Sequence, residues 1–112
     1  MRIMVAAMLV LACGAARADD CDKAMTQNDI NRCAEDRYDA ADRELNAVWR
    51  ALPPSLQASL RDEERRWIAR RDDACKAEAA ESEGGSIYPT EFYGCMERKT
   101  RERTRVLRAS HP

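Results

Sequence analysis

The stretch QNDINRCAEDRYDAADRELNAVWRALPP, residues 27–54, decides the fold. Its apolar residues recur at steps of three and four, at Ile30, Ala34, Tyr38, Ala41, Leu45, Val48 and Leu52. This spacing predicts one long helix with a single apolar face. Thr26, with Asp29 three residues later, resembles a capping box at the start of this helix. Pro53 and Pro54 end it, because proline lacks an amide donor and disfavours helical geometry in the residue before it.

Two more helices follow from the same spacing. Ser55 is expected to cap the second helix, and Gly84 and Gly85 to stop it. Pro89 suits the first turn of the third helix. Their apolar stripes are Leu56, Leu60, Trp67, Ile68 and Cys75, then Tyr88, Phe92, Met96, Thr100, Arg103, Val106 and Leu107. Because alternating apolar runs are absent, the sequence predicts an all-α, up-down-up bundle of three helices over about 27–52, 55–81 and 89–108.

Charged residues lie on or near these stripes and need partners. Glu64 and Arg71 are expected to pair with each other, or with an acid of the first helix such as Asp42, at the edge of the core. Asp72 and Arg103 are further candidates for structural polar residues. A catalytic carboxylate is the alternative for Glu64, but it lacks a convincing second group.

The end of the third helix is basic. Residues 97–112 contain six Lys or Arg and two Glu. A solvated face with favourable charge at a helix C-terminus explains this, and contact with an acidic partner is the alternative.

The N-terminus has the layout of a secretory signal peptide. Met1 and Arg2 precede an apolar run over residues 3–12, and the small-x-small site Ala16-Arg17-Ala18 precedes two aspartates. The sequence predicts a signal peptide over 1–18, cleavage after Ala18, and a periplasmic or secreted domain over 19–112. The apolar run is too short for a membrane-spanning helix. A lipoprotein acylated at Cys13 is less favoured, because Leu11 is large for that motif and the signal would be short.

The mature part is one small acidic domain. Its 94 residues suffice for one core, and 17 Lys and Arg face 20 Asp and Glu, a net charge of −3. This balance gives no general attraction to nucleic acid or to anionic lipid. No transmembrane segment is expected in the mature form, and the sequence does not set its oligomeric state.

Four cysteines remain after cleavage, at Cys21, Cys33, Cys75 and Cys95. An even number in a small exported domain predicts two disulfides. No CxxC pair exists and His111 is the only histidine, so no metal site, redox motif or other cofactor is expected. An antiparallel helix hairpin brings the cysteines to the end that carries the Gly84-Gly85 loop, which leaves all three pairings open. The shortest loops favour Cys21 with Cys33 and Cys75 with Cys95; the main rival joins Cys33 to Cys75 and Cys21 to Cys95.

The mature chain resembles the LprI-type lysozyme-inhibitor domain family from Cys21 to Leu107. One departure is Glu64, where the family commonly has Gln. The matching stretches are Cys21, Ala24-Met25-Thr26-Gln27, Asn31-x-Cys33-Ala34, Tyr38-x-Ala-Ala41-Asp42-x-x-Leu45-Asn46, Glu64-Arg65-x-Trp67-Ile68-x-x-Arg71-Asp72-x-x-Cys75, Gly84-Gly85-Ser86-Ile87-x-Pro89, Cys95 and Thr100-x-x-Arg103-Thr104-x-x-Leu107.

The resemblance implies inhibition of a lysozyme or another cell-wall hydrolase by a disulfide-pinned loop. The candidate partner-binding residues are Gly84, Gly85, Ser86 and Tyr88, and the acids Asp36 and Asp39 would steer a basic lysozyme. A tight interhelical turn with no binding role is the alternative for this loop. A non-enzymatic envelope interaction module is the alternative for the whole domain.

An enzyme is not expected. One terminal histidine and four paired cysteines leave no Ser-His-Asp or Cys-His set.

Overall fold

The computed structural model describes residues 18–111. The signal peptide predicted over 1–18 and Cys13 therefore lie outside the described residues, apart from Ala18, and stay predictions. The described part consists of a short 3-10 helix η1 (Ala18–Lys23), α1 (Gln27–Ala51), α2 (Pro54–Glu78), a second 3-10 helix η2 (Ala80–Ser82) and α3 (Tyr88–Ala109). These residues contain no strand. The prediction of an all-α, up-down-up arrangement of three helices is confirmed.

The helix ends follow local chemistry. The Thr26 Oγ1 accepts a hydrogen bond from the Asp29 amide at 3.1 Å, so Thr26 caps α1 as predicted. The capping role predicted for Ser55 is wrong, because Pro53 occupies the N-cap position and α2 begins at Pro54. Proline fits the first helical position, since its fixed φ suits the helix and no hydrogen bond is lost there. α2 ends at Glu78, before the predicted residue 81, because the chain tightens into η2.

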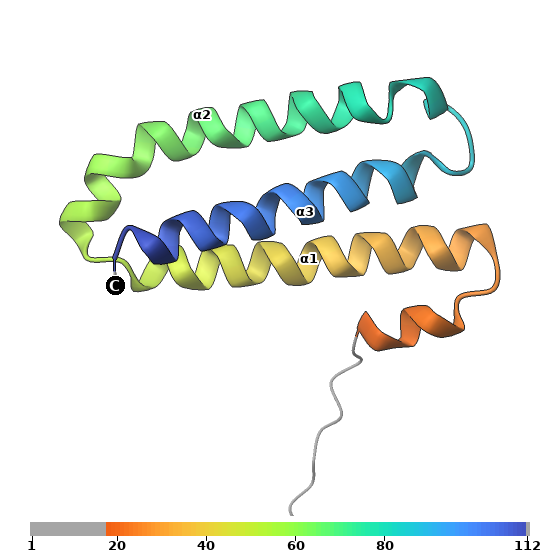
Figure 1. The fold of residues 1–112 in the computed structure, drawn as a ribbon, viewed down its shortest axis with the longest axis horizontal. Coiled ribbons are helices and arrows are strands. Elements are labelled where there is room, and N and C mark those ends of the chain that lie inside the picture. Colours follow the sequence, from red (N-terminus) through yellow and green to blue (C-terminus); the bar gives the residue numbers. More distant parts are fainter. Residues whose placement is uncertain (1–17, 112) are drawn as a thin grey trace, which may run out of the picture.

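α3 is the central helix. It lies between α1 and α2 and packs against both, more extensively against α1 (Figure 1). Its central place explains why α3 buries the most residues of the three helices.

Two hydrophobic clusters hold the ends of the bundle. Near the Pro53 turn, the buried Leu45, Leu52 and Leu107 are packed by residues of α1 and α2, namely Val48, Trp49, Leu56, Leu60 and Trp67. At the other end, the buried Cys75, Cys95 and Met96 are packed by Tyr38 and Phe92. All three helices therefore contribute to each cluster.

Three apolar residues of the predicted stripes stay exposed. Ile30, Ile68 and Val106 are 39%, 40% and 53% exposed. Val106 borders a hollow between α2 and α3, and Ile30 borders one beside η1. Periodicity marks the apolar side of each helix, but it does not show how far the neighbouring helix covers that side.

Both disulfides lie toward the end of the molecule that carries the loop between α2 and α3, because Cys33 is in the second turn of α1 and Cys75 is in the last turn of α2. Cys21 is joined to Cys33, and Cys75 to Cys95, with a Cα–Cα distance of 5.5 Å in each pair. This is the pairing with the shortest loops. The first bond fastens η1 to α1, while the second joins α2 to α3.

Candidate functional site

Two polar regions contain most of the residues singled out from the sequence. The first is a layer of buried arginines on α2 and α3. Arg103 binds the Glu64 carboxylate at 2.7 Å, and Arg71 binds the Asp72 carboxylate at 3.0 Å. Arg71 also donates to the Thr100 Oγ1 at 3.3 Å. The expected pairing of Glu64 with Arg71 is therefore wrong, because α3 brings Arg103 to Glu64 and leaves Arg71 to its neighbour.

Aromatic rings complete this layer. The guanidinium carbons of Arg71 and Arg103 lie 5.0 and 5.7 Å from the centre of the Trp67 ring, and Arg71 lies 5.6 Å from that of Tyr38. Such cation–π contacts stabilise a cation that has left water. Each buried side-chain nitrogen or oxygen in the described part of the chain has a hydrogen-bond partner. These contacts account for the burial of both arginines and indicate a structural role.

Asp42 stands apart from this layer. The expected pair between Asp42 and Glu64 or Arg71 is absent from the described ion pairs, and Asp42 instead accepts a hydrogen bond from the Asn46 side chain at 3.3 Å. Residues four apart on a helix meet readily, which explains this local partner.

The second region is the loop between η2 and α3, whose backbone geometry favours glycine at both Gly84 and Gly85. Gly84 has a φ of 79°, which favours glycine. A Cβ on Gly85 would lie 3.0 Å from the carbonyl oxygen of Ser82. The loop thus takes a shape that side chains at these two positions would resist.

Asn31 of α1 fixes this loop from the side. Its Nδ2 donates to the carbonyl oxygen of Ser86 at 2.7 Å, across 55 positions of the sequence. Its Oδ1 accepts hydrogen bonds from the Thr90 hydroxyl at 2.6 Å and from the side-chain Nε2 of Gln27 at 2.9 Å. The loop is therefore tied to α1 and to the first turn of α3 as well as pinned nearby by Cys75–Cys95.

Sequence reasoning assigned no role to these anchors. Gln27 and Asn31 stand in the stretches that carry the family resemblance, but helical spacing does not reveal a contact with a loop 55 residues away. The available signal is an asparagine near the start of a helix, two residues before a cysteine.

One apolar residue of this loop is exposed, and aromatic residues lie partly buried beside it. Ile87, which was not singled out, is 45% exposed, and Tyr88 is half-buried with its ring stacked 5.7 Å from that of Phe92. The rings of Tyr38 and Tyr93 stack at 5.8 Å. Burial raises the pKa of the Tyr93 hydroxyl, and the nearby carboxylates of Glu35 and Asp39 raise it further.

Burial also raises the pKa of Tyr38, although Arg71 opposes the shift. Asp36 and Asp39 are exposed on α1, so both carboxylates are accessible to a partner. The predicted loop residues lie beside the first turns of α1, where Asn31 holds Ser86, whereas Asp36 and Asp39 lie near the middle of that helix.

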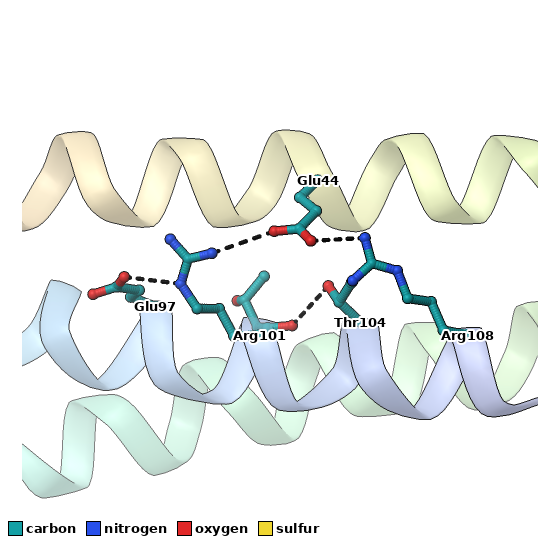
Figure 2. Close-up of polar contacts among 6 residues, drawn as sticks. Glu44, Glu97, Arg101, Thr104 and Arg108 are labelled. Atoms are coloured by element: carbon teal, nitrogen blue, oxygen red, sulfur yellow. Dashed lines mark hydrogen bonds and ion pairs between the residues drawn. The ribbon is translucent and has the colours of Figure 1, made fainter. Parts of the chain in front are cut away.

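The basic end of α3 is largely paired within the molecule. Figure 2 shows Glu44 of α1 between Arg101 and Arg108 of α3, with ion-pair distances of 3.3 and 2.8 Å. Arg101 also binds Glu97, and Arg98 binds Glu78. With Arg103, four of the six cations in residues 97–112 make ion pairs. These ion pairs favour a charged face whose cations are neutralised within the molecule over a face that awaits an acidic partner.

Within residues 18–111, no group of three or more His, Cys, Asp or Glu is placed to hold a metal ion. None of the described helices is long and apolar enough to cross a membrane.

Comparison with known proteins places the chain in a family. A protein of Rhizobium meliloti (strain 1021), described as uncharacterized, is 34% identical, and the match covers 96% of this chain and 94% of that protein. No solved structure matches. The model of the family described as "Lysozyme inhibitor LprI" matches residues 18–107, which include both disulfides, the arginine layer and the loop. The chain therefore belongs to the LprI lysozyme inhibitor family.

Proposed function

We propose that residues 19–112 form an exported domain that binds and inhibits a lysozyme or another cell-wall hydrolase. Membership of a family described as lysozyme inhibitors supports this function. The observation that carries it in the structure is the fixed loop, in which Asn31 holds Ser86 and the chain leads directly into the exposed Ile87.

Rigidity is what makes this loop suitable for binding. Ordering a mobile loop or side chain on association costs free energy, so a loop that is already ordered retains more of its contact energy. Ile87 and Tyr88 would form the apolar and aromatic centre of the contact, as aromatic and apolar anchors do in other interfaces. Asp36 and Asp39 would accelerate encounter with a basic hydrolase and set its orientation.

The ionisable residues of the arginine layer are engaged with one another, which supports binding rather than catalysis as the role of the domain. The two disulfides support export, because such bonds persist in oxidising compartments. We place the protein in the periplasm or outside the cell, with cleavage after Ala18. Mass spectrometry of the exported protein tests this cleavage site. An N-terminus at an acylated Cys13 would contradict cleavage after Ala18 and support the lipoprotein alternative.

An inhibition assay with the purified mature domain tests the function. Near-stoichiometric domain should lower the turnover of a muramidase. Ile87→Ser should weaken inhibition by about tenfold, the loss of ~1.4 kcal/mol that removal of one interface anchor produces. Ile68→Ser is the matched control, because Ile68 is exposed to a similar degree but lies in α2, away from the loop.

No inhibition at tenfold excess of the domain over any tested hydrolase would contradict the inhibitor function. Capture of a periplasmic protein that is lost with Ile87→Ser and retained with Ile68→Ser would then support the envelope interaction module. Equal effects of both variants would exclude the loop as the contact surface.

A further inference from the structure

A hollow between α2 and α3, away from the loop, has the features of a ligand site. Trp67 and Ala74 of α2 and Val106 of α3 supply its apolar lining, and its volume is about 300 Å³. This volume is at the small end of the range for sites that hold small molecules. The hollow is independent of the surface proposed for hydrolase binding.

Cations dominate the lining of this hollow. Arg70 and Arg71 reach it from α2, and Lys99 and Arg103 reach it from α3. Arg71 and Arg103 are nearly buried and each binds a carboxylate. Among residues 18–111, Arg70 and Lys99 make no ion pair. Two cations that make no ion pair therefore line one cavity, Arg70 from α2 and Lys99 from α3.

The position of Lys99 is the more informative of the two. Its side chain is partly buried, and burial of a cation without a partner costs free energy. Glu102 lines the same hollow but makes no ion pair with either cation. Because both cations line the same hollow, an anion bound there would be attracted by each of them.

We propose that this hollow binds a small ligand that bears a carboxylate or phosphate group. Lys99 supplies a compact positive charge, and Arg70 supplies a planar set of donors that matches either oxyanion. Trp67 and Ala74 line the same hollow and supply apolar contact beside these charges. The small side chain of Ala74 leaves the space that the ligand occupies.

Nuclear magnetic resonance titration of the mature domain at constant ionic strength tests the proposal. The probes are inorganic phosphate, acetate, glucuronate and, as the uncharged control, glucose. Phosphate or glucuronate should cause saturable shifts of the Trp67 indole and of the amides of residues 70, 74 and 99. Tighter binding of glucuronate than of acetate would indicate that the hollow contacts the sugar ring as well as the carboxylate, while binding of phosphate alone would indicate a phosphate ligand.

Three variants distinguish binding of an anion in this hollow from its nonspecific attraction to positive charge on the protein. Arg70→Gln with Lys99→Gln should weaken binding by at least about tenfold. Arg61→Gln with Lys76→Gln removes the same charge from exposed positions of α2 outside the hollow and should leave binding within about twofold. Ala74→Leu keeps every charge but fills the space, and it should also abolish binding.

Circular dichroism checks that each variant remains helical. The proposal is overturned if no charged probe produces a saturable shift, if glucose binds as well as glucuronate, or if both double variants weaken binding equally. Retained binding by Ala74→Leu would overturn the position of the site. None of these outcomes depends on hydrolase inhibition.

Discussion

The two interfaces of α3 are built differently. Toward α1, the helix with which α3 makes its more extensive contact, small side chains are deeply buried: Ala41 is fully enclosed, and Thr104 almost so (Figure 2). Toward α2, the layer contains the long side chains of Trp67, Arg71 and Arg103, and hollows of about 300 and 550 Å³ remain. Small residues let helices approach closely, whereas long polar residues hold them through a few specific bonds. The α1–α3 interface should therefore respond to added volume, and the α2–α3 interface to removal of single bonds.

Loss of Arg103 should have the largest effect. Arg103→Ala removes the partner of the nearly buried Glu64 and one cation at the Trp67 ring. Breaking a buried ion pair from one side costs about 3 to 5 kcal/mol of unfolding free energy, because a charge is left without compensation. Urea denaturation measures the change, and Arg105→Ala is the exposed control on the same helix.

Glu64→Gln is the finer test of that ion pair. The amide oxygen still accepts a hydrogen bond from Arg103, so the loss should be smaller, about 1 kcal/mol. A loss as large as that of Arg103→Ala would show that the charge of Glu64, rather than its hydrogen bond, holds the helices together.

Removal of the Cys75–Cys95 disulfide should have the next largest effect on stability after Arg103→Ala. The bond closes a loop of 20 residues, and its absence is expected to cost about 3 kcal/mol by the loop-entropy estimate. Cys75→Ala with Cys95→Ala should also raise amide hydrogen exchange in α2 more than in α1, because this bond joins α2 to α3. Cys21→Ala with Cys33→Ala is the matched comparison; it should affect chiefly η1, and equal exchange in α2 from both double variants would contradict the distinct roles.

Substitutions that add side-chain volume should distinguish the two interfaces by their effect on stability. Ala41→Leu forces extra carbon atoms into a fully buried position, and overpacking costs about 1 to 3 kcal/mol. Ala74→Leu adds the same atoms to an exposed position beside a hollow and should change stability by less than about 0.5 kcal/mol. Thermal or urea denaturation compares the two variants; equal losses would show that the α2–α3 interface is as tightly packed as the α1–α3 interface.

The same contrast explains what the sequence could and could not predict. Helical spacing, the prolines and the glycines predicted the three helices, because each depends on neighbours within a few residues. Loop length favoured the observed cysteine pairing. The partner of Glu64 was missed, since Arg103 lies 39 positions away and only the placement of α3 between α1 and α2 brings it there. Asn31 was missed for the same reason, and Ile87 because an exposed residue in a loop has no periodic pattern.

Loss of the Glu44 contacts should have the smallest effect. Glu44 links α1 to α3 through Arg101 and Arg108, but all three side chains are more than a third exposed, so water and salt screen the charges (Figure 2). Glu44→Gln should cost at most about 1 kcal/mol, and the cost should shrink between low and high salt. Denaturation at two salt concentrations measures it, with Glu83→Gln, which removes an exposed carboxylate that makes no described ion pair, as control. A larger, salt-independent loss would mean that this exposed network, and not the small buried residues, holds α1 against α3.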